Sequence, residues 1–134
     1  KAVEIGEAIE NAGRFGSEAH DQIHHDGEQF VRPTNRAGGL EGGITNGEEL
    51  RVRGYMKPIS TLRKALHSVD IDSKEDSLAA FERSDITAVP AAGVIAESMI
   101  AIVLADSLRE KFGGDSLHEM TRNHQAFLQS VSEY

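Results

Sequence analysis

Residues 35–54, NRAGGLEGGITNGEELRVRG, contain six of the 13 glycines in this 134-residue chain. Glycine makes up about 7% of an average protein, so this concentration needs a reason. Asn46-Gly47 is a strong tight-turn signal, and the stretch therefore predicts a β-hairpin. Its arms would be Ile44 and Thr45 on one side and Leu50, Val52 and Tyr55 on the other. Because glycine has no side chain, this backbone can also lie close to a phosphate or a planar ring.

The charge of the chain is uneven. Its formal net charge is -8, from 14 Lys and Arg against 22 Asp and Glu, which argues against general binding to DNA or RNA phosphates. Residues 51–69 nevertheless hold five basic residues and no acidic one. They are Arg51, Arg53, Lys57, Arg63 and Lys64. This basic run beside the glycines indicates a small, phosphate-bearing ligand; the alternative is a hairpin whose basic side chains are only solvated.

Several common site motifs are missing from the sequence. It has neither a GxGxxG fingerprint nor a GK[ST] phosphate loop, so the two commonest nucleotide folds are not supported. The lack of cysteine excludes disulfides, thiolate metal sites and a cysteine nucleophile, and fits an intracellular protein. His20 and His24 are four residues apart, but no helical pattern surrounds them and HExxH is absent, so we expect no metal site.

The second half of the chain predicts two helices. Residues 86–105 are apolar almost throughout, but Pro90, Gly93 and Glu97 argue against a membrane span. We therefore expect a central helix covered by protein on all sides, from about Pro90 to Phe112 and ended by Gly113-Gly114.

A second helix is expected to begin at Ser116, which forms a capping-box pattern with Glu119. Its apolar stripe would pack by one face on the domain or on another subunit. The stripe consists of Leu117, Met120, His124, Phe127 and Val131.

The first half is harder to interpret. Ile5, Ala8, Ile9 and Ala12 recur at helical spacing, which predicts a helix from residue 2 or 3 up to Gly13. Because no cap precedes this helix, we expect the chain to be part of a longer protein. Residues 17–29 read as a polar loop, 57–64 as an irregular connection and 66–71 as a short strand. With a length of 134 residues, one compact body is expected.

Arg83-Ser84-Asp85 stands directly before the apolar helix. Arg83 and Asp85 fit a salt bridge that holds a loop. They also fit a chemical pair in which the arginine anchors a phosphate and the aspartate accepts a proton.

Four segments follow one another along the chain: TNRAGGLEGGITNGEELRVR (34–53), MKPIST (56–61), ERSDITAVPAAGVIAE (82–97) and EKFGGDSL (110–117). Together they resemble the C-terminal part of the bacterial chorismate synthase family, and the resemblance extends over essentially the whole chain. It implies an α+β sandwich in which helices pack against antiparallel sheet. Residues 1–134 would be a C-terminal portion, a glycine-rich hairpin region followed by two helices, without the N-terminal two thirds.

The resemblance also implies an activity. The family eliminates phosphate from 5-enolpyruvylshikimate 3-phosphate to give chorismate in the shikimate pathway, with reduced FMN as cofactor and a link to NADP. It is a cytoplasmic lyase and usually a homotetramer, without nucleic acid or membrane partners. The matching FMN positions here are Gly42, Lys57, Pro58, Ile59, Ser60, Thr61 and Arg83, and Asp85 matches the aspartate proposed to accept a proton at the flavin ring nitrogen.

Other parts of the family's site, including its catalytic histidines, would lie outside this sequence, so the fragment alone is expected to be inactive. The alternative from another class is a non-catalytic module whose apolar helix and second-helix stripe serve only assembly.

Overall fold

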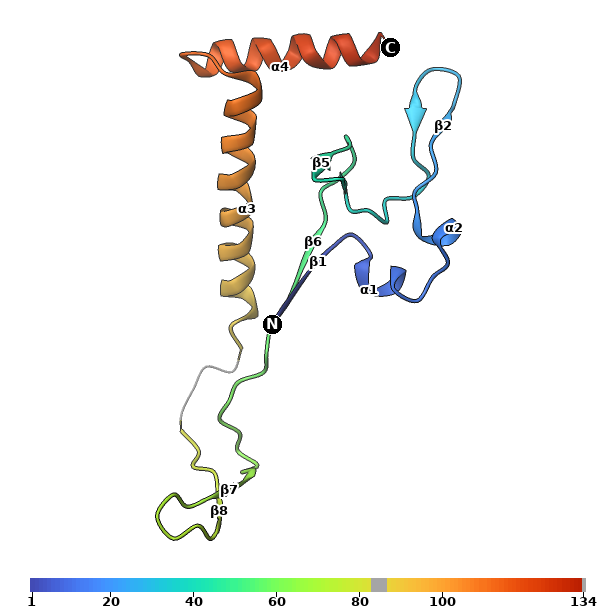
Figure 1. Ribbon diagram of the computed structural model, residues 1–134. Helices are drawn as coiled ribbons and strands as arrows, with labels where there is room; N and C mark the ends of the chain where they lie inside the picture. Colours follow the sequence, from blue (N-terminus) through green and yellow to red (C-terminus); the bar gives the residue numbers. More distant parts are fainter. Residues whose placement is uncertain (83–86, 134) are drawn as a thin grey trace.

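The computed structural model describes residues 1–82 and 87–133 and has an α+β fold (Figure 1). Its strands are β1 (Ala2–Ile5), β2 (His24–His25), β3 (Phe30–Val31), β4 (Leu40–Glu41), β5 (Ile44–Thr45), β6 (Val52–Tyr55), β7 (His67–Val69) and β8 (Asp76–Leu78). Its helices are α1 (Ala8–Asn11), α2 (Gly16–Ala19), α3 (Val89–Phe112) and α4 (Leu117–Ser132). The predicted α+β class is confirmed, and so is the order of a glycine-rich hairpin region followed by two helices.

Within residues 1–82 and 87–133 the strands form four two-stranded antiparallel sheets, of which β1–β6 is the longest. In this ribbon Ala2 pairs with Tyr55 and Ile5 with Val52. The predicted N-terminal helix over residues 2–12 is therefore wrong for its first half. A partner strand whose residues lie 47 to 53 positions away satisfies the backbone of β1, and the short helix α1 covers only Ala8–Asn11 of the predicted helix.

The predicted hairpin across Asn46-Gly47 is also wrong in its pairing. Ile44 and Thr45 pair backwards with Glu41 and Leu40 across a two-residue turn, while Val52–Tyr55 pair with β1. Residues 17–29, expected to be a loop, include most of α2 and the strand β2, which pairs with β3. The irregular connection over 57–64 is confirmed, and the short strand expected within 66–71 is β7.

The β1–β6 ribbon and the glycine-rich segment meet where two backbones touch. Gly6 has φ +64° and Gly38 φ +65°, and both residues are buried. A Cβ atom built on Gly6 would lie 2.0 Å from the Arg36 carbonyl oxygen, and one on Gly38 would lie 2.3 Å from the Gly6 nitrogen. Only glycine allows this approach, because any side chain would overlap the opposing backbone. We call this contact the Gly6–Gly38 crossing.

The two long helices follow the predicted bounds closely. Pro90 lies in the first turn of α3, and Gly113, with φ 50°, follows its last residue. The amide of Asn123 on α4 donates to the Phe112 carbonyl oxygen at 2.7 Å, which satisfies one of the free carbonyls at the end of α3. The Phe112 ring contacts the rings of His124 and Phe127 at centroid distances of 5.0 and 5.5 Å.

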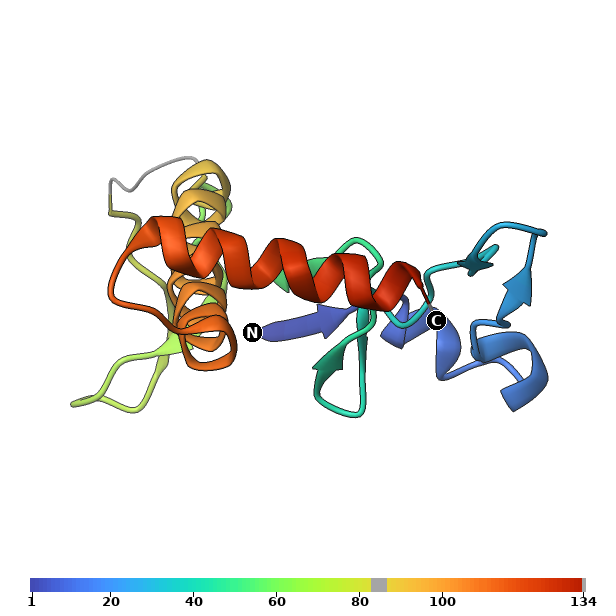
Figure 2. The same ribbon diagram turned by 90° about the horizontal axis from the view of Figure 1, so that it is seen from above.

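The N-cap of α4 is half of the expected capping box. The Ser116 hydroxyl accepts from the Glu119 backbone N–H at 3.2 Å, as predicted, but the Glu119 carboxylate accepts from the N–H of Asp115 rather than from that of Ser116. The sharp turn between α3 and α4 gives these two helices an L shape (Figure 1), and in Figure 2, where α3 is seen nearly end-on, α4 runs across the view.

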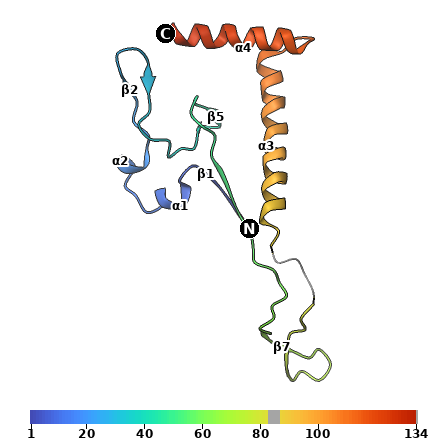
Figure 3. The ribbon, with the colours of Figure 1, turned by 180° about the vertical axis from the view of Figure 1, so that it is seen from behind.

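The molecule is extended, contrary to the expected compact body. The β7–β8 hairpin and α4 lie at opposite ends of it (Figure 3). Its accessible surface is 11408 Å², whereas a compact monomer of 14.5 kDa exposes roughly 6,900 Å². No apolar residue in the described ranges is buried.

The helix α3 is likewise exposed along its length and not covered as expected. By length and composition it is the one helix among the described residues that could cross a membrane, with a mean hydropathy of 1.7. Central helices of water-soluble proteins share these properties, so length and composition alone assign no membrane.

The Gly6–Gly38 crossing predicts a position-specific sensitivity to alanine. Gly38→Ala should destabilise the protein by about 1–3 kcal/mol or more, because the new Cβ meets backbone in a left-handed conformation. Gly54→Ala is the matched control, since a Cβ there has no heavy atom within 4 Å. Urea unfolding of both variants measures the effect, and equal midpoints would contradict it.

Candidate functional site

The β4–β5 hairpin presents a bare backbone turn. Gly42 and Gly43 have φ values of 58° and 78°, the signature of a type I′ turn. A Cβ built on either residue would have no heavy atom of the described chain within 4 Å. The two amide planes at the tip are therefore open to a ligand, which is what the FMN position expected at Gly42 requires.

Asn35 closes the base of the segment that holds this hairpin. Its side-chain oxygen accepts from the Gly39 N–H at 2.8 Å, and its amide donates to the Glu49 carbonyl oxygen at 2.8 Å. One side chain thus joins both ends of residues 39–49. The Asn46-Gly47 turn signal lies within this segment, where the Asn46 carboxamide oxygen accepts from the Glu48 N–H at 3.0 Å.

Asp21 holds the preceding arm, which contains β2 and β3. Its two carboxylate oxygens accept from the Thr34 hydroxyl at 2.5 Å and from the backbone N–H groups of Arg36 and Ala37 at 2.9 and 2.8 Å. Desolvation alone would raise the pKa of Asp21, but these donors outweigh it and lower the pKa. The arm is therefore tied at its base to the backbone beside the Gly6–Gly38 crossing.

Glu4 is the buried polar residue of the described chain, with 3% of its surface exposed. Its carboxylate accepts from the Tyr55 hydroxyl in a short hydrogen bond, from Arg53 Nη1 at 2.9 Å and from the Ile9 N–H at 3.1 Å. The Tyr55 bond contributes most to lowering the pKa of Glu4 from 4.5 to about 2. The same bond raises the pKa of Tyr55. Glu4 thus joins β1, β6 and the first turn of α1.

Two of the five basic residues in residues 51–69 already form ion pairs within the chain. Arg53 pairs with Glu4, and Arg51 Nε lies 2.7 Å from Glu49 Oε2. Lys57, Arg63 and Lys64 are exposed and form no ion pair with another described residue. Three of the five basic side chains in this run are therefore available to bind an anionic ligand.

The expected site residues are not gathered into one cluster within the described chain. Residues 57–61 (Lys57, Pro58, Ile59, Ser60 and Thr61) continue directly from β6 as irregular chain. This segment and the β4–β5 hairpin lie toward opposite ends of β6 (Figure 1). Arg83 and Asp85 lie outside the described residues.

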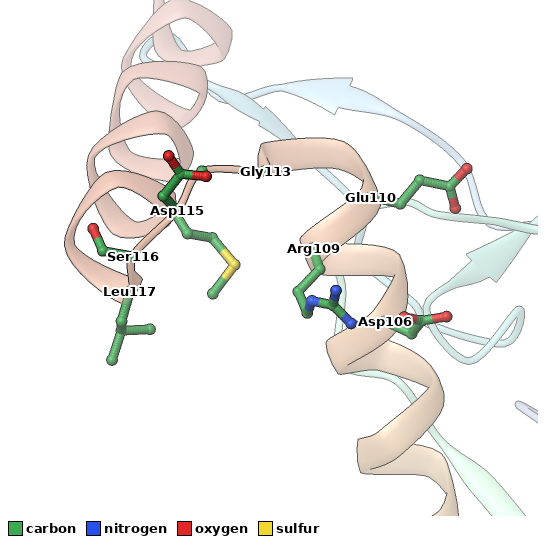
Figure 4. A pocket seen from close by; sticks show the side chains of 9 residues that line it. Asp106, Arg109, Glu110, Gly113, Asp115, Ser116 and Leu117 are labelled. Atoms are coloured by element: carbon green, nitrogen blue, oxygen red, sulfur yellow. Dashed lines mark hydrogen bonds and ion pairs between the residues drawn. The ribbon is translucent and has the colours of Figure 1, made fainter.

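One hollow in the described part of the chain, of about 720 Å³, lies between the β1–β6 ribbon and the first half of α3; apolar side chains and Glu97 line it. Another, of about 640 Å³, lies at the corner between α3 and α4 (Figure 4). Its charged lining residues are Asp106, Glu110 and Asp115 against Arg109. Its net negative charge is unsuited to a phosphate, and no described residue of the expected flavin site lines either of these two hollows.

Histidine and carboxylate side chains do not form a metal site within the described residues, where no group of three or more lies together. His24 instead contacts Gln22, and the His25 ring accepts from the Gly27 N–H at 3.2 Å.

Comparison with known proteins shows the family to which the chain belongs. A family model described as chorismate synthase matches residues 1–108. The chain belongs to the chorismate synthase family. The resemblance in the sequence motifs is thereby confirmed.

Individual chorismate synthases are similar over the whole of this chain. The protein of Solibacter usitatus is 57% identical over 136 residues, and that of Mycolicibacterium smegmatis is 56% identical over 133 residues. These matches cover 100% and 99% of this chain but 35% and 33% of the relatives, so the chain spans about one third of their length. A solved structure described as "Crystal Structure of Chorismate Synthase" superposes with a TM-score of 0.76 at 41% identity, over 100% of this chain and 33% of that one.

Sequence reasoning missed the residues that hold the site together. Glu4 lies in the stretch that the sequence predicted as a helix, and Asp21 in the stretch that it predicted as a polar loop. Apart from Ile9, their partners lie 13 to 51 residues away, so no local pattern indicates them. Asn35 precedes the first glycine pair by three residues, and its enrichment in turns was the one available signal.

The Glu4 network predicts a pH dependence of stability. Because folding lowers the pKa of Glu4, its stabilising contribution is complete above about pH 4.5 and is lost as pH falls toward about 2. The urea midpoint should differ most between wild type and Glu4→Gln near neutral pH, and the difference should shrink below pH 4.5. Glu10→Gln, at an exposed position of α1, is the control. A difference that is constant with pH would contradict the assignment.

Proposed function

We propose that this chain forms the C-terminal third of a chorismate synthase, residues 1–134 being one portion of a larger domain. The enzyme would be a carbon-oxygen lyase of aromatic amino-acid biosynthesis that converts 5-enolpyruvylshikimate 3-phosphate to chorismate and phosphate. Family membership over residues 1–108 is the observation that carries the proposal. The assigned partners are the small-molecule substrate and further copies of the enzyme in a cytoplasmic homotetramer, with neither nucleic acid nor membrane.

The described residues suit reduced FMN. The Gly42-Gly43 turn leaves backbone open to a planar ring, since no described atom would touch a Cβ there. Lys57 is an exposed cation at the start of residues 57–61 and can donate to an anionic group of the flavin or substrate. The chemistry that reduced flavin would supply, when bound there, is electron density for the allylic system of the substrate. In this proposal NADP takes part only in the reduction of the flavin and not in the elimination of phosphate.

The residues of this chain have three roles in the proposal. Gly42, residues 57–61 and Arg83 bind and orient the cofactor. Arg83 also neutralises negative charge of the anionic ligands, and Asp85 accepts a proton. Stabilisation of charge by fixed cations and proton transfer at a placed carboxylate are the contributions a protein can make to such an elimination. The remaining catalytic groups would come from the part of the enzyme outside these 134 residues.

One observation favours a second function, a non-catalytic assembly module. The apolar helix α3 and the α4 residues Leu117 and Val131 are exposed, and their burial requires another protein surface. Gel filtration and FMN titration of the 134-residue chain separate the two functions. An oligomer that does not bind FMN favours assembly, whereas retained FMN binding favours a partial active site.

Removal of the Lys57 charge tests cofactor binding. In the complete enzyme, Lys57→Ala should weaken binding of reduced FMN or of substrate by about 10- to 100-fold, the loss of one charge-assisted hydrogen bond. Arg122→Ala removes an exposed cation from α4 and is the control. Anaerobic titration measures both affinities, and unchanged values for Lys57→Ala would count against its role.

The variant Asp85→Asn tests whether Asp85 accepts a proton in the reaction. Asp85→Asn in the complete enzyme should reduce phosphate release by about 10²- to 10⁴-fold, because an amide cannot accept the proton. FMN affinity is measured in parallel to separate chemistry from binding. Turnover at the wild-type rate would exclude Asp85 as the proton acceptor.

A further inference from the structure

The β4–β5 hairpin is too short to fix its own direction. Each strand has two residues, and the ladder consists of the pairs Leu40 with Thr45 and Glu41 with Ile44. An isolated two-stranded hairpin is at best marginally stable in water, even when it is longer than this one. Contacts from outside the ladder must therefore decide where the Gly42-Gly43 turn points.

A polar cluster at the edge of the hairpin provides such contacts. Arg32, the residue after β3, reaches Glu41 with Nη2 at 3.3 Å from Oε2, and its Nη1 donates to the Asn46 carbonyl oxygen at 3.4 Å. The Asn46 side-chain amide donates to the same Glu41 Oε2 at 2.7 Å. Glu41 is the last residue of β4, and Asn46 directly follows β5. We call these three residues the Arg32 clamp.

The Arg32 clamp is connected to the better-anchored part of the chain. The Asn46 N–H donates to the Gly39 carbonyl oxygen at 3.1 Å, and Gly39 is buried with its own N–H bonded to Asn35. The Arg32 side chain is 20% exposed, and its buried Nε has no hydrogen-bond partner among the residues that the structure describes. A planar fork that contacts two separate acceptors sets orientation as well as position, which a lysine cannot do.

We propose that Arg32 is a positioning residue for the cofactor: acting through Glu41 and Asn46, it holds the Gly42-Gly43 turn in the direction in which the turn meets the flavin. The inference rests on the proposed function. Arg32 contacts the hairpin and not the flavin, so the geometry of its fork matters more than its charge.

The test uses matched variants of the complete enzyme. Arg32→Lys retains the charge but loses the fork, and Glu41→Ala removes the shared acceptor; both should weaken reduced-FMN binding by about 3- to 10-fold, the loss of one ordinary hydrogen bond. Glu41→Gln keeps an oxygen that accepts from both Arg32 and Asn46, and should bind FMN like the wild type. Arg51→Lys, at the exposed Arg51–Glu49 pair, is the control.

Anaerobic titration gives the affinities, and visible circular dichroism of the bound flavin gives a signal that a merely less stable protein would not change. The inference is overturned if Arg32→Lys and Glu41→Ala bind FMN with wild-type affinity and spectrum. It is also overturned if Glu41→Gln is as weak as Glu41→Ala, because charge and not geometry would then be the cause. Glu41→Ala decides alone if Arg32→Lys does not fold.

Lys57→Ala, measured in the same titration, separates this inference from the proposed function. If Lys57→Ala weakens FMN binding while both Arg32→Lys and Glu41→Ala do not, only the positioning role fails. If none of the three variants changes FMN binding, the assignment of a flavin site to this chain fails with it.

Discussion

The Gly6–Gly38 crossing is the contact on which the N-terminal half depends. At this point the Gly6 N–H donates to the Arg51 carbonyl oxygen, and the Arg51 N–H donates to the Gly38 carbonyl oxygen, at 2.9 and 3.0 Å. Three segments that are far apart in the sequence thereby share one set of backbone hydrogen bonds. The bonds are possible because neither glycine has a Cβ atom to separate the chains.

Two kinds of glycine result from this arrangement. Gly6, Gly38 and Gly39 are buried and permit backbone to lie against backbone. Gly42 and Gly43 lie beyond them at a free turn, where the missing side chains leave room for a ligand instead. The proposed cofactor-binding turn is thus separated by only two residues from the rigid contact that supports it, and the Arg32 clamp joins the two.

The distribution of polar and apolar residues is the reverse of that in an independent domain. The buried side chain is a carboxylate, Glu4, which three donors hold in its charged form, whereas α3 is apolar and exposed. Hydrogen bonds and glycine contacts give local order to the first half, but they bury little apolar surface. Most of the hydrophobic stabilisation must therefore come from other protein surfaces, which agrees with a chain that spans about one third of its relatives' length.

The sequence by itself determined the family, the α+β class and the two long helices. Pro90, the Gly113-Gly114 pair and Ser116 mark helix ends through their own backbone and side-chain chemistry, so no distant partner is needed to interpret them. The cofactor residues followed from the motifs alone, and they remain predictions.

Only the tertiary structure decided the strand pairing and the support of the site. Residues 2–5 lie in a stretch whose pattern predicts a helix, yet their backbone hydrogen bonds go to Val52–Tyr55. Asn46-Gly47 and Gly42-Gly43 are both good turn sequences, but of the two only Gly42-Gly43 joins paired strands. The roles of Glu4, Asp21 and Arg32 likewise depend on partners distant in sequence. The conformational preferences of single residues cannot choose among such pairings, because the stabilising contacts form only when the distant segments come together.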